Sequence, residues 1–99
     1  MIVKLEESIK HGTDEISELE INRPNLSLIR KLGLPVKITS EGVDGFDIDV
    51  CAKYLEAITA LPPSVINQLT FSDFMACTNV LLSFFESGAS VQKAHLKQQ

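Results

Sequence analysis

The sequence predicts a small α+β domain, with an N-terminal antiparallel β-hairpin over residues 2–22 followed by three to four α-helices. The hairpin follows from two stretches in which apolar and polar residues alternate, because a period of two is typical of half-buried strands. The helices follow from apolar residues that recur every three or four positions between capping and breaking residues. The 99 residues suit a single domain.

The predicted hairpin has its apolar side chains at alternate positions. Val3, Leu5 and Ile9 are separated by polar residues in the first strand, and the second strand repeats the pattern over 17–21. Gly12 lies in the turn between them, where glycine readily adopts a positive φ. Because an isolated hairpin is marginally stable in water, we expect helices to cover its apolar face.

A short helix is expected at about 25–33. Asn25 is a favourable N-cap, and Gly33 suits the residue that follows the last helical turn. Two glycines then interrupt the pattern, so we expect 36–45 to form a loop, with a short edge strand at 36–38.

Two further helices are expected at about 47–61 and 63–69. Asp47 or Asp49 caps the first of them, and Pro63 suits the first turn of the second. The stripe of the longer helix expected to face the core consists of Val50, Tyr54, Ile58 and Leu61.

The last strong helix is expected at 71–87, with Gly88 as its stop. Apolar residues fill nearly all of its circumference, whereas an amphipathic surface helix shows only a third to a half of its circumference as apolar. It must therefore be covered on two sides. We expect 1–88 to form the single domain and 89–99 to form a polar, flexible tail.

The surplus apolar surface of this helix has two interpretations. A small domain needs its best hydrophobic residues inside, so the helix is suited to be the core of a monomer. Alternatively, one side faces the core and the other faces a partner or a second copy of the chain. On the second interpretation we assign Phe85 to the core and Phe84 to the partner. The candidate protein-binding residues are Phe71, Met75, Val80 and Phe84.

No catalytic or metal site emerges from the sequence. The three aspartates within 44–49 suggest a calcium site, but Gly45 is wrongly placed for an EF-hand loop, and the twelfth position counted from Asp44 holds Leu55 in place of glutamate. Cys51 and Cys77 do not fall at zinc-ligand spacing, and the two histidines lie in a turn and in the tail. With no nucleophile elbow or phosphate-binding loop, we expect no enzyme, no metal and no cofactor.

Charge is unevenly distributed along the chain, whose net charge is −4. Residues 22–40 carry four basic side chains and no acidic one, whereas 41–88 carry seven acidic side chains and one basic. The basic segment 23–37 raises the alternative of a small nucleic-acid-binding regulatory protein. We favour the interpretation that Arg30 and Lys31 complement the dipole at the end of the first helix, because no aromatic residues accompany the basic ones. We therefore expect no nucleic-acid partner.

The sequence also bears on location. The apolar stretch 71–85 is too short and too often interrupted by polar residues to cross a bilayer. The first residues lack the layout of a signal peptide, and the two cysteines do not form a CxxC pair. We expect a cytoplasmic protein with reduced thiols and no membrane partner.

Two blocks of the sequence carry a family resemblance. The first, 16–24, is a strand that ends at an Arg-Pro corner. The second block comprises the segments 54–59, 61–66, 69–74 and 83–84. Together they resemble the small tail assembly chaperones of long-tailed phages and prophages, especially contractile-tailed ones. The resemblance covers most of residues 2–86.

This resemblance implies a non-catalytic protein that binds the tape-measure protein and keeps it soluble until tail-tube subunits polymerise around it. It also implies a longer form, made by a programmed frameshift, which engages the tail-tube protein. Such chaperones act in the cytoplasm of the bacterial host and are absent from the mature virion. The surplus apolar surface leads us to expect a homo-oligomer as well.

Overall fold

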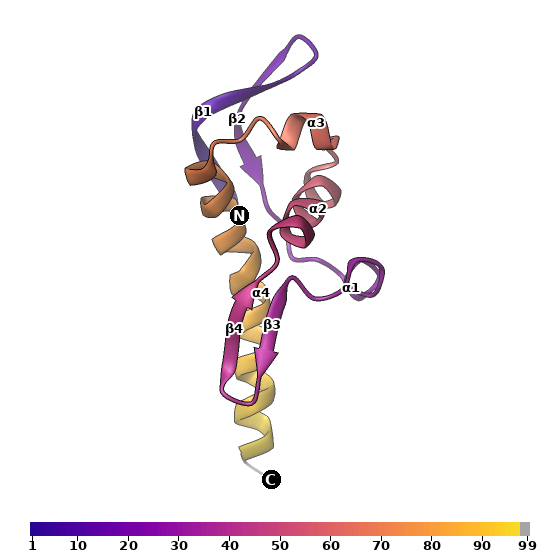
Figure 1. Cartoon of the computed structure of the whole chain (residues 1–99), viewed down its shortest axis with the longest axis vertical. Coiled ribbons are helices and arrows are strands. Elements are labelled where there is room, and N and C mark those ends of the chain that lie inside the picture. The colour runs from indigo at the N-terminus through magenta and orange to yellow at the C-terminus, as the bar shows by residue number, and fades with distance from the viewer. Residues whose placement is uncertain (98–99) are drawn as a thin grey trace.

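A computed structural model describes the backbone of residues 1–97, and side chains within that range except at 38, 42–44 and 86–97. The elements in chain order are β1 (Ile2–His11), β2 (Asp14–Glu20), α1 (Leu26–Leu32), β3 (Val36–Thr39), β4 (Gly42–Phe46), α2 (Ile48–Thr59), α3 (Pro63–Ile66) and α4 (Phe71–Lys97). The α+β fold with an N-terminal hairpin and helices after it is confirmed (Figure 1). The molecule measures 55 × 25 × 20 Å, and the long helix α4 accounts for its elongated form (Figure 1).

Strands β1 and β2 form an antiparallel pair with an irregularity in β1. Val3 pairs with Leu19 and Ile9 with Ile16, and the register shifts between Lys4 and Ile9. Val3, Ile9 and Leu19 are buried as predicted. Ser17 is exposed and its neighbour Ile16 is half-buried, so the alternation of the second strand holds only from Glu18 onward. The extra residues of β1 form a bulge, which leaves backbone groups there without a partner on β2.

Two polar side chains from the helical part of the chain bind this irregular strand. The carboxylate of Asp73, in the first turn of α4, accepts hydrogen bonds from the backbone N–H groups of Glu6 (2.9 Å) and Glu7 (3.1 Å). The side-chain amide of Gln68 accepts from the Lys10 N–H (2.8 Å) and donates to the Lys10 carbonyl (2.7 Å). These contacts fix the start of α4 against the outer edge of β1.

Helix α1 begins and ends as predicted. The Asn25 side chain accepts a hydrogen bond from the Leu28 N–H at 2.9 Å, which satisfies one free donor of the first turn. Gly33 follows the helix with a φ of 82°, and its N–H donates to the Ile29 carbonyl. The positive φ explains why glycine occupies this position.

The loop predicted over 36–45 is wrong in its second half. Strand β3 covers the predicted edge strand and pairs with β4 as a second antiparallel hairpin. Pro35 anchors its base, because its carbonyl accepts from the Asp47 N–H at 2.9 Å and from the Cys51 thiol at 3.9 Å. Two glycines within a five-residue strand, Gly42 and Gly45, gave this segment the local pattern of a loop, and the pairing partner was not apparent from that pattern.

Helix α2 is capped by Asp47, whose carboxylate accepts from the Val50 N–H at 3.1 Å. Of the residues predicted for its inner face, only Tyr54 is buried. The other buried residues of this helix are Cys51 and Leu55. The other three predicted positions, Val50, Ile58 and Leu61, are only half-buried. Helices α1, α3 and α4 and strand β2 all contact α2. The centre of its buried face therefore lies about one residue away from the centre of the stripe that the sequence pattern predicts.

The ends of α2 and α3 also differ from prediction, whereas α3 begins at Pro63 as expected. The helix stops at Thr59, and Ala60 adopts a left-handed conformation with φ 58°. This conformation costs a non-glycine residue about 1 kcal/mol. Helix α3 is one turn long and ends at Ile66, three residues before the predicted end.

Helix α4 does not stop at Gly88. Its backbone continues to Lys97, through most of the segment predicted to be a flexible tail. A single glycine costs a helix about 1 kcal/mol relative to alanine, which the helix-forming residues on both sides offset. The division into a 1–88 domain and an 89–99 tail stays a prediction.

The core lies where the inner face of the β1–β2 hairpin meets α2, α3 and α4. Its buried members are Val3, Leu19, Ile21, Cys51, Tyr54, Leu55, Ile66, Cys77 and Leu81. Thr78 is also fully buried, and its hydroxyl has no hydrogen-bond partner among the described residues. The core is thus a single cluster between one hairpin and three helices.

Candidate functional site

Helix α4 turns one line of residues toward the core. Asp73, Cys77 and Leu81 are buried at spacings of four, as expected for one face of a helix. Successive residues lie about 100° apart around the axis, so Phe71 falls about 80° beyond one edge of this line, whereas Val80 falls about 20° beyond the other edge and Phe84 lies just inside it. The apolar surface of α4 therefore continues beyond the core on two edges.

The four predicted binding residues divide between these edges. Phe71, which is exposed, and Met75, which is half-buried, lie on one edge one turn apart. Val80 and Phe84 lie on the other edge, where both pack partly against the core. The structure does not bring the four together, and their role in binding stays a prediction.

The edge that contains Phe71 borders an apolar groove of about 300 Å³. Phe71 is 71% exposed, and Ile48 at the start of α2 is 58% exposed. Between these two side chains the groove is lined by Ala52, Ile66, Asn67, Leu69 and Phe74. No charged side chain lines it, so it is suited to apolar side chains of a partner.

Sequence reasoning identified Phe71 and missed Ile48. Both occupy the first position of a helix, after the caps Asp47 and Thr70. The Thr70 hydroxyl accepts a hydrogen bond from the Asp73 N–H at 3.1 Å, which places Phe71 directly after a capping residue. A large apolar side chain immediately after an N-cap was the signal that would have found Ile48, because first-turn positions commonly face solvent.

Phe84 and Phe85 have different surroundings. The Phe85 ring contacts buried Tyr54 edge-on, with ring centroids 5.7 Å apart and an interplanar angle of 80°. The guanidinium of Arg23 lies over the Phe84 ring, 5.6 Å from its centroid. The contact of Phe85 with a buried residue and that of Phe84 with an exposed one agree with the assignment of Phe85 to the core.

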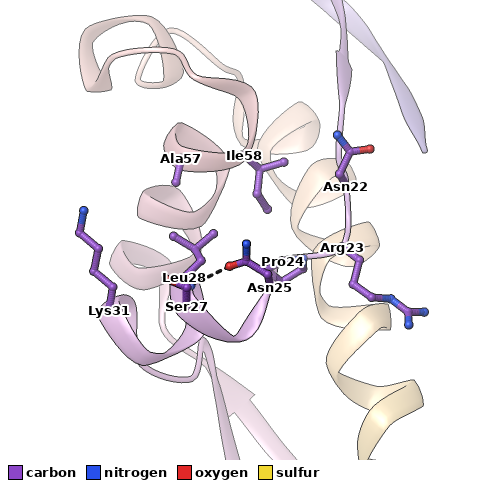
Figure 2. A pocket seen from close by; sticks show the side chains of 9 residues that line it. All are labelled: Asn22, Arg23, Pro24, Asn25, Ser27, Leu28, Lys31, Ala57 and Ile58. Carbon is purple, nitrogen blue, oxygen red and sulfur yellow. Dashed lines mark hydrogen bonds between the residues drawn. The ribbon is translucent and has the colours of Figure 1, made fainter.

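Two of the four basic residues in the segment 23–37, Arg23 and Lys31, point away from each other (Figure 2). A groove of about 400 Å³ lies between the β2–α1 corner and α2. Figure 2 shows Arg23 extending toward α4 and Lys31 extending the opposite way, with Leu28 and Ile58 between them. Arg30 and Lys31 lie in the last turn of α1, where basic residues complement the helix dipole.

The two buried cysteines, Cys51 and Cys77, are held in their neutral thiol form. Burial, followed by the nearby carboxylate of Asp47, raises the pKa of Cys51 to about 11. Burial, followed by Asp73, raises the pKa of Cys77 to about 11. Thiols with such pKa values are poor nucleophiles at neutral pH. Among the residues whose positions are described, no cluster of three potential metal ligands occurs.

Asp73 is the exception, because it is buried and yet favours its charged form. Its strongest influence is the Glu6 N–H, which lowers the pKa of the carboxyl. Desolvation opposes this effect, but the Glu7 N–H and the Thr70 hydroxyl add to it, so the pKa lies below the ordinary value of 3.8. Because the hydrogen bonds of Asp73 all join it to the β1–β2 hairpin or to the start of α4, we assign it a structural role.

A family model of phage tail assembly chaperone proteins, described as "E, or 41 or 14", matches residues 2–86. The chain belongs to this family. The match spans the core elements and the first half of α4, and it confirms the resemblance carried by the 16–24 and 54–84 blocks. No curated protein and no solved structure matches this tail assembly chaperone.

Membership assigns the chaperone a role in building phage tails, which implies protein partners. Within the part of the chain that the structure describes, no helix is long and apolar enough to cross a membrane. The apolar groove beside Phe71 is a surface suited to apolar side chains of such a partner.

Proposed function

We propose that this chaperone acts without catalysis, by binding the tape-measure protein and keeping it soluble during tail assembly. The observation that carries the proposal is the apolar groove between Ile48 and Phe71. A tape-measure protein is long and helical, and apolar side chains on one of its helices would fit a groove without charged lining. The net charge of −4 would help keep the complex in solution.

The remaining parts of the proposal concern where and with whom the chaperone acts. It works in the cytoplasm of the bacterial host and is left out of the mature virion. It forms a homo-oligomer, and a frameshifted longer form engages the tail-tube protein. Neither nucleic acid nor membrane is a partner, because Arg23 and Lys31 point apart (Figure 2) and the chain carries a net charge of −4, which disfavours anionic surfaces.

Co-expression with the tape-measure protein encoded in the same genome tests the binding surface. The test variant is the pair Ile48→Ser and Phe71→Ser, which removes both exposed walls of the groove. The matched control is Leu26→Ser, because Leu26 is 68% exposed on α1 and lies outside the groove. The parent, the double variant and the Leu26 variant are expected to melt at similar temperatures, since none of the changed side chains belongs to the buried core.

We expect the parent and the Leu26 variant to keep the tape-measure protein in the soluble fraction, and the double variant to leave it in the pellet. If the double variant solubilises the client as well as the parent does, the groove is not the client site. If the parent itself fails to solubilise or bind the client, the proposed function is wrong.

A further inference from the structure

The two edges of the β1–β2 hairpin differ in how their backbone groups are satisfied. On the β1 edge, Asp73 accepts from the N–H groups of Glu6 and Glu7, and Gln68 pairs with the backbone of Lys10. Within the described part of the chain, no backbone or side-chain group pairs with the outer edge of β2. The outer edge of β1 is therefore covered over residues 6–10, whereas the outer edge of β2 is open.

The register identifies which groups of β2 face outward. Met1 and Ile21 exchange both backbone hydrogen bonds, so they form a hydrogen-bonded pair. Such pairs alternate with non-hydrogen-bonded ones along an antiparallel ladder, so Leu19 also bonds toward β1. Glu18 and Glu20, which alternate with these residues, turn their N–H and C=O groups away from β1. An incoming strand would pair with these two residues.

A groove of about 300 Å³ lies directly beside this open edge. It runs between β2 and the C-terminal end of α2, with Glu18 and Glu20 on the strand side and Ile58 and Leu61 on the helix side. Side chains of a strand point alternately to its two faces. A strand added to β2 would therefore place every second side chain in the groove, against Ile58 and Leu61.

The charge of β2 restricts what the added strand can be. The strand contains four acidic residues and no basic one, and Glu18 and Glu20 are exposed on the face opposite the core. Edge-to-edge pairing of two copies through β2 would set like charges against one another, which is destabilising. A partner strand with basic side chains on that face would instead form favourable cross-strand pairs.

We propose that the outer edge of β2 binds an extended polypeptide segment of a partner, with lysine or arginine at alternate positions and apolar side chains between them. The segment forms a third strand of the sheet. Its basic side chains lie beside Glu18 and Glu20, and its apolar side chains enter the groove next to Ile58. This surface shares no residue with the groove between Ile48 and Phe71.

The test is an NMR titration of the isotope-labelled full chain with a heptapeptide of alternating lysine and valine. We expect saturable binding, slower hydrogen exchange at the amides of Glu18 and Glu20, and weaker affinity at higher salt. The main variant is Glu18→Pro, which removes the outward N–H without touching a bond to β1. The matched control is Glu18→Ala, which removes the carboxylate and keeps the N–H.

Affinity for the lysine–valine peptide is expected to fall at least about tenfold in the Pro variant and only about threefold in the Ala variant. Circular dichroism checks that both variants fold. If Glu18→Pro unfolds, the pair Glu18→Lys and Glu20→Lys replaces it. That pair is expected to lose the lysine–valine peptide and to bind a glutamate–valine peptide instead.

Three outcomes would overturn the proposal. The first is no saturable binding up to about 1 mM peptide. The second is binding whose amide changes lie away from β2. The third is that the folded Glu18→Pro variant, or the Glu18→Lys and Glu20→Lys variant, binds the lysine–valine peptide as tightly as the parent does. None of these outcomes depends on the tape-measure protein, so they are distinct from a failure of the proposed function.

Discussion

Adjacent phenylalanines on α4 offer the sharpest test of how this small domain divides core from surface. Phe85 contacts the buried Tyr54 ring edge-on at 5.7 Å, whereas Phe84 lies under the exposed Arg23 at 5.6 Å. Both side chains are half-buried, so exposure alone does not separate them. We predict that replacing each by alanine has very different effects on stability.

Phe85→Ala is expected to destabilise the fold by about 3 kcal/mol. A fully buried phenylalanine costs about 3–5 kcal/mol on truncation to alanine. Partial exposure lowers this range, and loss of the aromatic pair with Tyr54 adds about 0.5–1.5 kcal/mol. Phe84→Ala is expected to cost only about 1 kcal/mol, because an exposed cation–π contact contributes about 0.5–1 kcal/mol and the ring packs only partly against the core, with no buried aromatic partner among the described residues.

Thermal melts followed by circular dichroism measure both changes. For a chain of this size, 1 kcal/mol lowers Tm by about 4–8 °C, so about 12–24 °C is expected for Phe85→Ala and about 4–8 °C for Phe84→Ala. Arg23→Met is the control, and it should account for most of the Phe84 effect. Equal shifts for the two phenylalanines, or a larger one for Phe84, would refute the assignment of Phe85 to the core.

Three further predictions follow from buried polar groups. The folded pKa of Asp73 lies below 3.8, so its contribution to stability is present above that pH and is lost as the pH falls through the folded pKa. The free energy of unfolding in urea should therefore fall with pH across the acid range in the parent, and the part of this fall that is due to Asp73 should be missing in Asp73→Asn. Thr78→Val removes a buried hydroxyl without a described partner and should raise stability by about 1 kcal/mol, seen as a higher urea midpoint; a lower midpoint would show that the hydroxyl is bonded. Cys51 and Cys77, with pKa values of about 11, should resist iodoacetamide at neutral pH until urea unfolds the chain, and mass spectrometry of the native protein should detect no adduct.

Several features of this chaperone were determined by the sequence alone, because they depend on residues close together in the chain. The β1–β2 hairpin was predictable from alternation and a turn glycine. The caps Asn25 and Asp47 were predictable because a side chain bonds a backbone N–H three residues on. The family resemblance likewise came from short local motifs, and the match over 2–86 confirmed it.

The candidate site was only partly predictable. The composition of α4 showed that its apolar surface exceeds what one core face needs, and Phe71 was correctly selected as a residue outside the core. The sequence did not show that Phe71 shares a groove with Ile48, which lies 23 positions earlier in the chain. Nor did it separate Val80 and Phe84 from Phe71, because the edge each one occupies depends on which side of the helix meets the core.

Only the tertiary structure decided the features that join distant residues. The β3–β4 hairpin exists because Val36–Thr39 pairs with Gly42–Phe46 and Pro35 anchors the base of the hairpin to the start of α2. Asp73 lies in the first turn of α4, where an acidic residue is expected for local reasons. Its carboxylate nevertheless accepts hydrogen bonds from the β1 bulge, more than 60 residues earlier in the chain. The same contacts cover the middle of the outer β1 edge and leave the outer β2 edge open. Local sequence sets what each segment can form, whereas the partners of a buried carboxylate or a strand edge are fixed only when the whole chain packs.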